Sequence, residues 1–476
     1  MLESYMEAIY KTCQKNPEKI ALITDERKLT YRELISDIIS FAEKLKNKKI
    51  KKRSRILLET FDTAGFFTAF IACSAAGVIA VPIEAGMSVY RLHEIINTTK
   101  PSLIFLNENG EKYSDFITDQ NGNNVIIKKF PAADNEAVII STTGTTGNPS
   151  LILHTNESLY AAAENLAAGT SIDEDTVMLT NMPIYLSTGY LRVMATLIKG
   201  GTVIVTDSPY DEELIKNYSD KYKITRLSMI STSLSSLVNE YRKSGGSLPK
   251  SVKQAESVAS VLPGHAALDF HRLFPEVTLY NVYGTTESGC ILIHNTADKY
   301  DSDCIGKPAV NADIILLDEN GDKITKPGSY GHVAVRGRMN MKCYYKKKSL
   351  TEKVVRDDRI IINDIAYFDN EGFFHFVSRV GDIINVSGQK ITPLEIEDAA
   401  IGYDGIEDCA CTKKEDTERG EVPVLYVVKG KDYDADKLMV FLRDKLEQYR
   451  RPEEIIEIDK IPRTSTGKIM RHILGL

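Results

Sequence analysis

The sequence predicts an α/β fold followed by a smaller α+β domain, and three features of the chain indicate this. The first half alternates helical and strand patterns, which is typical of largely parallel sheets covered by helices. Residues 313–377 then show strand and turn patterns, and the texture changes again near residue 379. Because 476 residues exceed what one core usually holds, we divide the chain into a large domain, residues 1–378, and a small domain, residues 379–476.

Apolar spacing places the elements of the first half. The predicted helices cover residues 30–46, 66–76 and 88–99, and the predicted strands cover residues 55–59, 78–82 and 102–106. The apolar stretch 64–83 is about long enough to cross a bilayer. Gly77, Pro82 and the lack of a flanking basic cluster favour instead a buried helix followed by a strand.

Further along the chain, short apolar runs alternate with turn residues. Strands are predicted at residues 138–140, 151–153, 202–205 and 226–230, a helix at 232–243, and turns at 318–321 and 369–372. In the small domain, Thr392, Pro393 and Glu395 predict a helix start with a capping box. A later helix presents one apolar face, made of Leu438, Phe441, Leu442 and Leu446.

Charge and cysteine content limit the partners and the compartment. A net charge of −7 and a pI near 5.8 give no general attraction to nucleic acid or to anionic lipid. The seven cysteines are scattered without a CxxC pair. We therefore predict a reduced, cytoplasmic protein that acts on a small molecule, without structural zinc, membrane span or nucleic-acid partner.

The most informative segment is the phosphate loop, residues 141–149 (STTGTTGNP), which lies between two apolar strands. Glycines let backbone N–H groups turn inward and threonine hydroxyls add donors, so the loop can form an anion-binding nest. It is not a Walker loop, because two residues separate Gly144 from Gly147 and no lysine follows. Taken alone, the segment also fits a flexible polar hairpin.

Three further segments accompany this loop: Tyr283 to Glu287 (YGTTE), Asp364 followed by Arg379, and Gly467-Lys468. In this order and at these intervals the chain resembles the adenylate-forming superfamily of acyl- and aryl-CoA synthetases, peptide-synthetase adenylation domains and luciferases. The resemblance covers almost the whole chain. It implies αβ-layered sheets plus a distorted β-barrel in the large domain, and a small mobile domain that acts as a lid.

By this resemblance the chain activates a carboxylic acid with ATP and Mg²⁺ as an acyl-adenylate and then passes the acyl group to a thiol. Making a carboxylate oxygen a leaving group brings anions together, so the site must supply positive charge and donors. The resemblance assigns Lys468 as the catalytic lysine, Thr286 to the α-phosphate and Glu287 to Mg²⁺. The phosphate-binding residues it implies are Thr142, Thr143, Gly144, Thr145, Thr146 and Gly147.

The nucleoside half of the site also follows from the resemblance. Tyr283, with Gly284 beside it, is expected to stack on adenine, and Asn281 lies near the amino edge of the base. Asp364 is expected to accept hydrogen bonds from the ribose hydroxyls, assisted by Arg379. The family pivot, usually Asp or Lys, is Gly381 here, and Gly388 is expected to approach the pantetheine arm after the small domain rotates.

Three positions depart from the family pattern. The lysine that usually follows the phosphate loop is Ser150, so we expect weaker ATP binding without loss of the chemistry. The usual GGAP segment is residues 258–261 (VASV), whose bulk narrows the expected acyl pocket. His332 replaces a usual glutamate, which we interpret as a surface change.

Leu186 narrows the substrate class, because amino-acid-activating relatives carry an aspartate there to pair with the ammonium group. Tyr185, Leu186, Tyr190 and Val261 are expected to line a pocket for an aryl or fatty acid. The acceptor is expected to be CoA or the phosphopantetheine of a separate carrier protein. Two alternatives remain open at this point: an enzyme that loads a carrier protein, and a catalytically silent nucleotide-binding relative.

Overall fold

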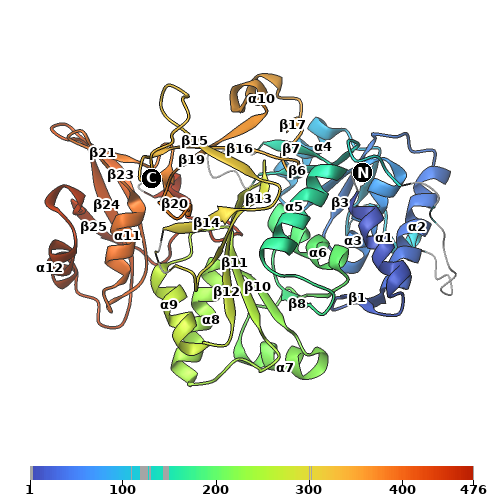
Figure 1. Ribbon diagram of the computed structural model, residues 1–476, viewed down its shortest axis with the longest axis horizontal. Helices are drawn as coiled ribbons and strands as arrows, with labels where there is room; N and C mark the ends of the chain where they lie inside the picture. The colour runs from blue at the N-terminus through green and yellow to red at the C-terminus, as the bar shows by residue number, and fades with distance from the viewer. Residues whose placement is uncertain are drawn as a thin grey trace.

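The computed structural model describes residues 4–474 except residues 109, 118–126, 128–129, 143–149, 300 and 302. Within these residues the strands form sheets of fourteen, six and five strands. The first two sheets and their helices make up most of the molecule, and the third sheet stands at the C-terminal end (Figure 1). This is the predicted α/β fold class with a smaller α+β unit.

The six-stranded sheet contains the two strands that flank the phosphate loop. Its order is β17 (Cys343–Tyr344), β7 (Leu151–Thr155), β6 (Glu136–Ser141), β4 (Ile79–Ile83), β3 (Arg55–Glu59) and β5 (Leu103–Phe105). Strands β3, β4, β5 and β6 pair in parallel, whereas β7 pairs with β6 and β17 in antiparallel fashion. The helices around this part of the chain are α1 (Tyr5–Lys15), α2 (Tyr31–Asn47), α3 (Thr63–Ala76) and α4 (Val89–Thr99).

Helix α3 and strand β4 account for the apolar stretch 64–83. Asp62 caps the start of α3 by accepting a hydrogen bond from Gly65 N, and Gly77 ends the helix with φ +72°. Residues 64–74 are all buried, so the stretch forms core. No helix within the described residues is long and apolar enough to cross a membrane.

One half of the large sheet, in which every strand except β2 pairs in parallel, follows the predicted strand and helix alternation. Its strands are β1 (Ile20–Ile23), β2 (Lys28–Thr30), β8 (Val177–Thr180), β9 (Thr202–Val205), β10 (Arg226–Ile230), β11 (Gln254–Val258) and β12 (Thr278–Thr285). The helices are α5 (Asn156–Gly169), α6 (Ser187–Lys199), α7 (Glu212–Tyr222), α8 (Ser231–Ser244) and α9 (Gly264–Leu273). Helices α8 and α9 lie side by side on one face of β10 to β12, and α5 and α6 lie on the other (Figure 1).

The sheet continues in antiparallel pairings toward its other edge. These strands are β13 (Gly289–Asn295), β14 (Cys304–Pro308), β15 (Asp313–Leu317), β16 (Gly331–Arg336), β18 (Val355–Arg356), β19 (Arg359–Phe368) and β20 (Phe374–Arg379). They occupy the place expected for a distorted barrel, and the described pairings run from β15 through β13 without closing a ring. Both predicted turns are present, with Gly321 and Gly372 at positive φ. Helix α10 (Lys348–Val354) interrupts a stretch expected to hold only strands and turns.

The small sheet contains β21 (Ile384–Val386), β22 (Gln389–Ile391), β23 (Ile406–Asp416), β24 (Gly420–Lys429) and β25 (Glu454–Glu457), with α11 (Pro393–Ile401) and α12 (Ala435–Lys445). Thr392 caps α11 as predicted, whereas the Glu395 carboxylate lies 3.6 Å from Arg450 Nε instead of closing the capping box. The predicted apolar face of α12 packs into this unit's own core. Short 3₁₀ turns among the described residues lie at Tyr113–Phe116, Gln448–Arg450 and Arg471–Ile473.

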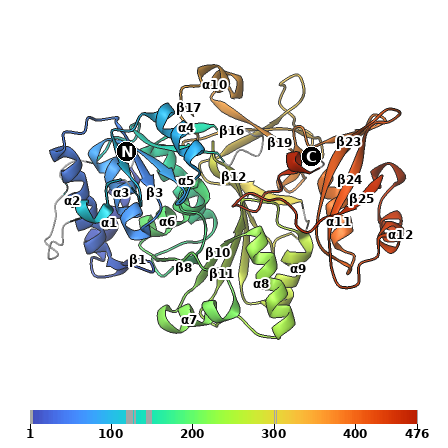
Figure 2. The same cartoon turned by 180° about the vertical axis from the view of Figure 1, so that it is seen from behind.

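The segment after β25 runs from the small sheet back to the centre of the molecule (Figure 2). It contains the lysine loop, residues 462–471. Gly467 in this loop has φ +79°, and a Cβ there would lie 3.0 Å from the Thr232 hydroxyl at the start of α8. The loop is therefore in close contact with the large sheet's helices.

Candidate active site

Tyr283, Asp364 and Arg379 come together although they lie on different strands. The Tyr283 hydroxyl donates to Asp364 Oδ2 at 2.6 Å, and Arg379 Nε lies 3.3 Å from Asp364 Oδ1. Asp364 and Arg379 are directly opposed partners in the β19/β20 pairing, which fixes their proximity. Burial and the Asp364 carboxylate raise the pKa of Tyr283 well above its usual value, so its hydroxyl remains a donor.

Thr286 and Glu287 form the turn between β12 and β13, and three further side chains or backbone groups hold this turn. Buried His154 contacts the Thr286 carbonyl through Nε2 at 2.8 Å and Ser158 Oγ through Nδ1 at 3.1 Å. Tyr344 donates its hydroxyl to Glu287 Oε1 at 2.8 Å, and the Glu287 carbonyl accepts from Met341 N at 2.7 Å. The turn is thus anchored from β7, β17 and the segment before β17.

His154 is neutral in this environment, because burial lowers its pKa to about 4. A carbonyl can only accept, so the contact with Thr286 places the ring proton on Nε2 and leaves Nδ1 to accept from Ser158. The sequence analysis did not single out His154. A lone histidine after an apolar strand carries no signal of a partner 132 positions away.

Lys468 reaches the same place from the lysine loop. It is half-buried, and burial together with the nearby Arg379 guanidinium lowers its pKa to about 8, against the opposing effects of Asp364 and Glu287. At neutral pH about nine-tenths of the ammonium groups remain protonated at this value. A cation therefore faces the carboxylates expected to bind ribose and Mg²⁺.

Hydrogen bonds within the lysine loop hold its shape. Thr464 N donates to the Lys468 carbonyl at 2.9 Å, and Lys468 N donates to Thr464 Oγ1 at 3.2 Å. Arg463 donates to the Gly467 carbonyl at 2.9 Å and pairs with Asp408 of β23 at 2.8 Å. The lysine is thus carried on a loop that is tied to the small sheet.

The four predicted pocket residues differ in their burial and in the residues that they contact. Tyr185 lies against the lysine loop, with its hydroxyl 3.2 Å from Ser465 Oγ. Leu186 precedes α6 and is buried, whereas Val261 is 38% exposed. Tyr190 is fully buried, and its ring centroid lies 5.3 Å from that of Phe70 on α3. Their role in binding an acid remains a prediction.

Asn281 and Gly284 have structural reasons for their identity. Asn281 is buried and donates from Nδ2 to the Cys304 carbonyl at 3.5 Å, which links β12 to β14. A Cβ at Gly284 would lie 2.0 Å from the Gly289 carbonyl oxygen, so only glycine fits where β12 and β13 approach. This close approach positions the turn that carries Thr286 and Glu287.

Of the phosphate loop, only Ser141 and Thr142 belong to the described residues, and Ser150 directly follows the loop. Thr142 N donates to the Ser150 carbonyl, and Ser150 N donates to Thr142 Oγ1, both at 2.9 Å. The other predicted phosphate-binding residues lie outside the described residues: Thr143, Gly144, Thr145, Thr146 and Gly147. Two basic side chains, which the sequence analysis missed, contact the loop ends. Lys347 Nζ donates to Ser150 Oγ at 3.3 Å and Arg91 Nη2 donates to Ser141 Oγ at 2.6 Å.

The expected pivot, Gly381, and Gly388, which is expected to approach the pantetheine arm, adopt backbone conformations that favour glycine. Gly381 has φ +102°, and a Cβ there would meet nothing within 4 Å. Ser387 and Gly388, at φ +50° and +87°, form the two-residue turn between β21 and β22, as expected for a type I′ hairpin. Arg471 lies 3.6 Å from Asp382 and 2.7 Å from Glu397, so it links the segment after the pivot to α11.

The residues that meet at this site can bind Mg²⁺, which does not need a cluster of protein ligands. Among the described residues, no group of three or more His, Cys, Asp or Glu side chains could hold a metal. This ion typically takes one or two carboxylates and completes its shell with phosphate and water. Glu287, with Tyr344 bonded to one of its oxygens, is such a single carboxylate.

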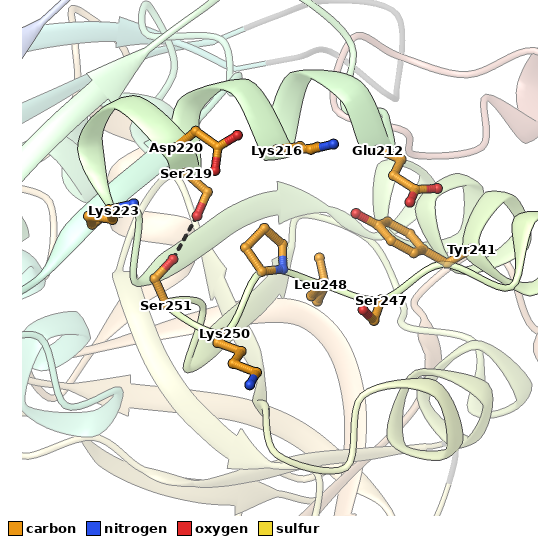
Figure 3. A pocket seen from close by; sticks show the side chains of 11 residues that line it. Glu212, Lys216, Ser219, Asp220, Lys223, Tyr241, Ser247, Leu248, Lys250 and Ser251 are labelled. Atoms are coloured by element: carbon orange, nitrogen blue, oxygen red, sulfur yellow. Dashed lines mark hydrogen bonds between the residues drawn. The ribbon is translucent and has the colours of Figure 1, made fainter.

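A separate surface hollow of about 530 Å³ lies between α7 and the segment after α8 (Figure 3). Its lining includes Glu212, Lys216 and Tyr241, and Ser219 Oγ lies 2.7 Å from Ser251 Oγ at one end. None of the predicted site residues contributes to it. We assign it no role in the chemistry.

Two family models match the chain. The model described as AMP-binding enzyme matches residues 9–345, and the model described as AMP-binding enzyme C-terminal domain matches residues 395–468. The 2-succinylbenzoate-CoA ligase of Bacillus subtilis is 24% identical and covers 100% of this chain and 98% of its own length. The feruloyl-CoA synthase of an Amycolatopsis species is 26% identical, over 97% and 96%.

Solved structures show the same fold. The o-succinylbenzoate CoA synthetase (MenE) from Bacillus subtilis, in complex with the acyl-adenylate intermediate OSB-AMP, superposes with a TM-score of 0.87 at 22% identity, over 100% of this chain and 98% of that one. ATP-bound MatB from Rhodopseudomonas palustris gives 0.89 at 19% identity with the same coverage. Both structures therefore superpose on the large sheets and on the small C-terminal unit at the same time.

Proposed function

The chain belongs to the AMP-binding enzyme family, and on that basis we propose that it is an ATP-dependent acid–thiol ligase. It activates a carboxylic acid as an acyl-adenylate and transfers the acyl group to the thiol of CoA. The observation that carries this proposal is the meeting of Lys468 with Asp364, Arg379 and Glu287. A silent nucleotide-binding relative would have no chemical need for this set.

In the first half-reaction a carboxylate oxygen attacks the α-phosphate of ATP, and pyrophosphate leaves. Lys468 donates hydrogen bonds to the two reacting anions, and its protonated ammonium offsets the negative charge that builds up between them. We expect Thr286 to contact the α-phosphate. Glu287 would hold Mg²⁺, which when bound neutralises charge on the phosphates.

Asp364 and Arg379 bind the ribose, and Tyr283 orients the base. The 2.6 Å bond from Tyr283 to Asp364 fixes the ring relative to the carboxylate. Because a carboxylate can accept several donors, Asp364 can take the ribose hydroxyls in addition. The nucleoside is thus positioned by groups on β12, β19 and β20, all of one sheet.

The second half-reaction requires the lysine loop to leave. We propose that the small domain, from residue 379 onward, rotates about Gly381 and brings Gly388 toward the pantetheine arm of CoA. The contacts that must break include Tyr185 with Ser465 and Gly467 with Thr232. Neutral contacts of this kind cost little to break, which suits a reversible motion.

The acid is an aryl or aliphatic acid and not an α-amino acid. Leu186 offers no counter-charge for an ammonium group at the position where amino-acid-activating relatives have an aspartate. CoA is the preferred acceptor because the relatives described above are named as CoA ligases or synthases. We also place the enzyme in the cytoplasm, since all seven cysteines are free thiols.

Substituting Lys468 with alanine tests the assignment. In an ATP–pyrophosphate exchange assay across aryl and short- to medium-chain acids, K468A should be about 100- to 1,000-fold slower than the unmodified enzyme. When supplied with a preformed acyl-adenylate, the variant should form thioester nearly normally. The matched control is Lys460→Ala, an exposed lysine eight positions earlier. Equal exchange rates for K468A and K460A would remove Lys468 from the mechanism, and comparing CoA with a phosphopantetheinylated carrier protein would identify the acceptor.

A further inference from the structure

A charged cluster lies wholly inside the large domain, beyond the residues assigned above. The buried triad consists of Arg192 on α6, Arg226 on β10 and Glu256 on β11, with side chains 2%, 0% and 0% exposed. Arg192 Nε lies 2.8 Å from Glu256 Oε1, and Arg226 Nη2 lies 2.7 Å from Glu256 Oε2. Ser228 also donates to Glu256 Oε1.

The triad carries one more positive charge than negative. Burial opposes ionisation of Glu256, but the two guanidinium groups hold its pKa at about 2, so the carboxylate is charged at neutral pH. Cys290, which is close enough to interact electrostatically, has its pKa raised to about 12 by burial and stays a neutral thiol. A buried net charge is unfavourable without a further counter-charge.

The two arginines differ in the donors that they leave unused. Arg226 is engaged at Nη2 by Glu256 and at Nη1 by the Thr170 carbonyl and Gln254, and its guanidinium stacks over Tyr280. Only its Nε, with a single N–H, lacks a partner among the described residues. Arg192 uses Nε for Glu256 and Nη1 for the Thr188 carbonyl, and its Nη2 is buried without a hydrogen-bond partner in the described part of the chain. One face of the fork therefore presents unused N–H donors.

Two more buried polar atoms lack partners among the described residues, one on α6 and one just before β13, the strand whose Cys290 interacts with Arg192. They are Thr188 Oγ1, one helical turn before Arg192 on α6, and Ser288 Oγ, directly after Glu287. Leu191 of α6 contacts the position that follows, because a Cβ on Gly289 would lie 3.9 Å from Leu191 Cδ1. Unsatisfied buried donors that cluster in this way indicate a missing polar ligand.

The position of the cluster connects it to the active site. Thr188 and Arg192 lie one turn apart on one face of α6, and Tyr185, two residues before the helix, contacts the lysine loop through Ser465. Tyr185 and Thr188 are half-buried while Arg192 is buried, so exposure decreases along the chain from Tyr185 to Arg192. Arg192 lies about 6 Å deeper along the helix than Thr188. Glu256 pairs with Tyr280 of β12, the strand that carries Tyr283.

We propose that Arg192, with Thr188 and Ser288, forms the floor of the acid pocket and binds a second carboxylate, so that the substrate is a dicarboxylic acid. This inference rests on the proposed function. A planar fork with unused donors matches a carboxylate in shape and charge, whereas water alone would satisfy the donors and leave the charge unbalanced. One carboxylate is activated beside Lys468, and the other is held at Arg192.

The test compares pairs of acids that differ only in the distal carboxylate. Suitable pairs are 2-succinylbenzoate with 4-oxo-4-phenylbutanoate, and adipate with hexanoate, measured by ATP–pyrophosphate exchange. For the better pair, the unmodified enzyme should favour the diacid at least tenfold in kcat/KM. R192M should lose that preference by lowering kcat/KM for the diacid about 100-fold, with little change for the monoacid, and R192K should restore part of it.

Arg226→Met is the matched control, because it also removes one guanidinium from Glu256. It should leave the ratio of diacid to monoacid unchanged. A monoacid preference in the unmodified enzyme, or an equal loss for both acids in R192M and R226M, would overturn the assignment. If R192M does not fold, the unmodified enzyme's ratio still tests whether the substrate is a diacid, and R192K tests the role of Arg192. Exchange with no acid at all would instead overturn the proposed function, and exchange with monoacids alone would overturn only the role of Arg192.

Discussion

The hydroxyl oxygens of Tyr185 and Ser465 lie 3.2 Å apart although 280 positions separate them in the chain. One residue precedes α6 in the large domain, and the other belongs to the loop that carries Lys468. Under the proposed rotation of the small domain, this contact would break when the lysine loop leaves. Substitutions at Tyr185 or Ser465 should therefore affect the two half-reactions to different extents.

Removing the Tyr185 hydroxyl should slow adenylation and spare thioester formation. A neutral hydrogen bond contributes about 0.5–1.5 kcal/mol, so Y185F should lower the adenylation rate about two- to tenfold. Pyrophosphate exchange measures the first step, and thioester formation from a preformed acyl-adenylate measures the second.

A double-mutant cycle with Ser465→Ala isolates the contact from other effects of the substitution. The Y185F,S465A double variant should be no slower than the worse single variant. Fully additive losses would show that the two hydroxyls do not act together.

Lys347 should supply part of the charge missing at Ser150. Its ammonium donates to Ser150 Oγ at 3.3 Å, beside the end of the phosphate loop. Because the pair is exposed, the effect is small, and K347A should raise the KM for ATP about two- to fivefold with little change in kcat. The measurement is initial-rate kinetics with varied ATP at saturating acid.

Placing a lysine at position 150 provides the complementary test. The S150K,K347A double variant should return the KM for ATP to near its original value, and Lys346→Ala serves as a neighbouring control. A KM for ATP that K347A leaves unchanged would show that Lys347 does not act on the phosphates.

The local elements of this fold follow closely from the sequence. Strands 55–59, 202–205 and 226–230 match the structure residue for residue, because each is an apolar run bounded by clear breaks. Helix starts are equally legible where a capping residue stands, as at Thr30 and Thr392. Helix α10 was not predicted, because its short, largely polar sequence has no buried face.

The site was predictable only where a family motif marks it. The pairing of Tyr283 with Asp364 joins two motifs, so their convergence could be anticipated. His154, Lys347 and Arg192 could not, since each acts on a partner far away in the chain and a single polar residue carries no local signature of it. The charged residues in β10 and β11 make the burial of these strands hard to predict, because the same sequence would suit an exposed strand.

Adenylation should depend on a lysine that titrates near neutral pH. The pKa of Lys468 is lowered to about 8 by burial and by Arg379, and the protonated form is the one that stabilises the transferring phosphate. The rate of adenylation should therefore be highest below pH 8 and fall about tenfold for each pH unit above it. The measurement is kcat/KM for the acid in pyrophosphate exchange between pH 6 and 10.

Neutralising the neighbouring cation tests this assignment. Arg379→Gln should move the alkaline limb of the profile to higher pH, because one of the two causes of the lowered pKa is gone. The limb should shift even though the variant also binds ATP more weakly. A limb that stays in place would assign the titration to another group.

His154 should make the large domain sensitive to acid. Its folded pKa of about 4 lies below the usual value of 6.5, so the unfolded chain binds a proton that the folded protein rejects. The free energy of unfolding should therefore fall as pH drops from 6.5 toward 4, by about 3 kcal/mol from this group.

H154Q keeps an amide donor for the Thr286 carbonyl but cannot titrate, so its free energy of unfolding should fall less over that range. Urea unfolding at pH 7 and pH 5 gives the comparison, with exposed His93→Gln as the control that should behave like the unmodified protein. An identical acid-induced loss in H154Q and the unmodified protein would mean that folding does not lower the pKa of His154.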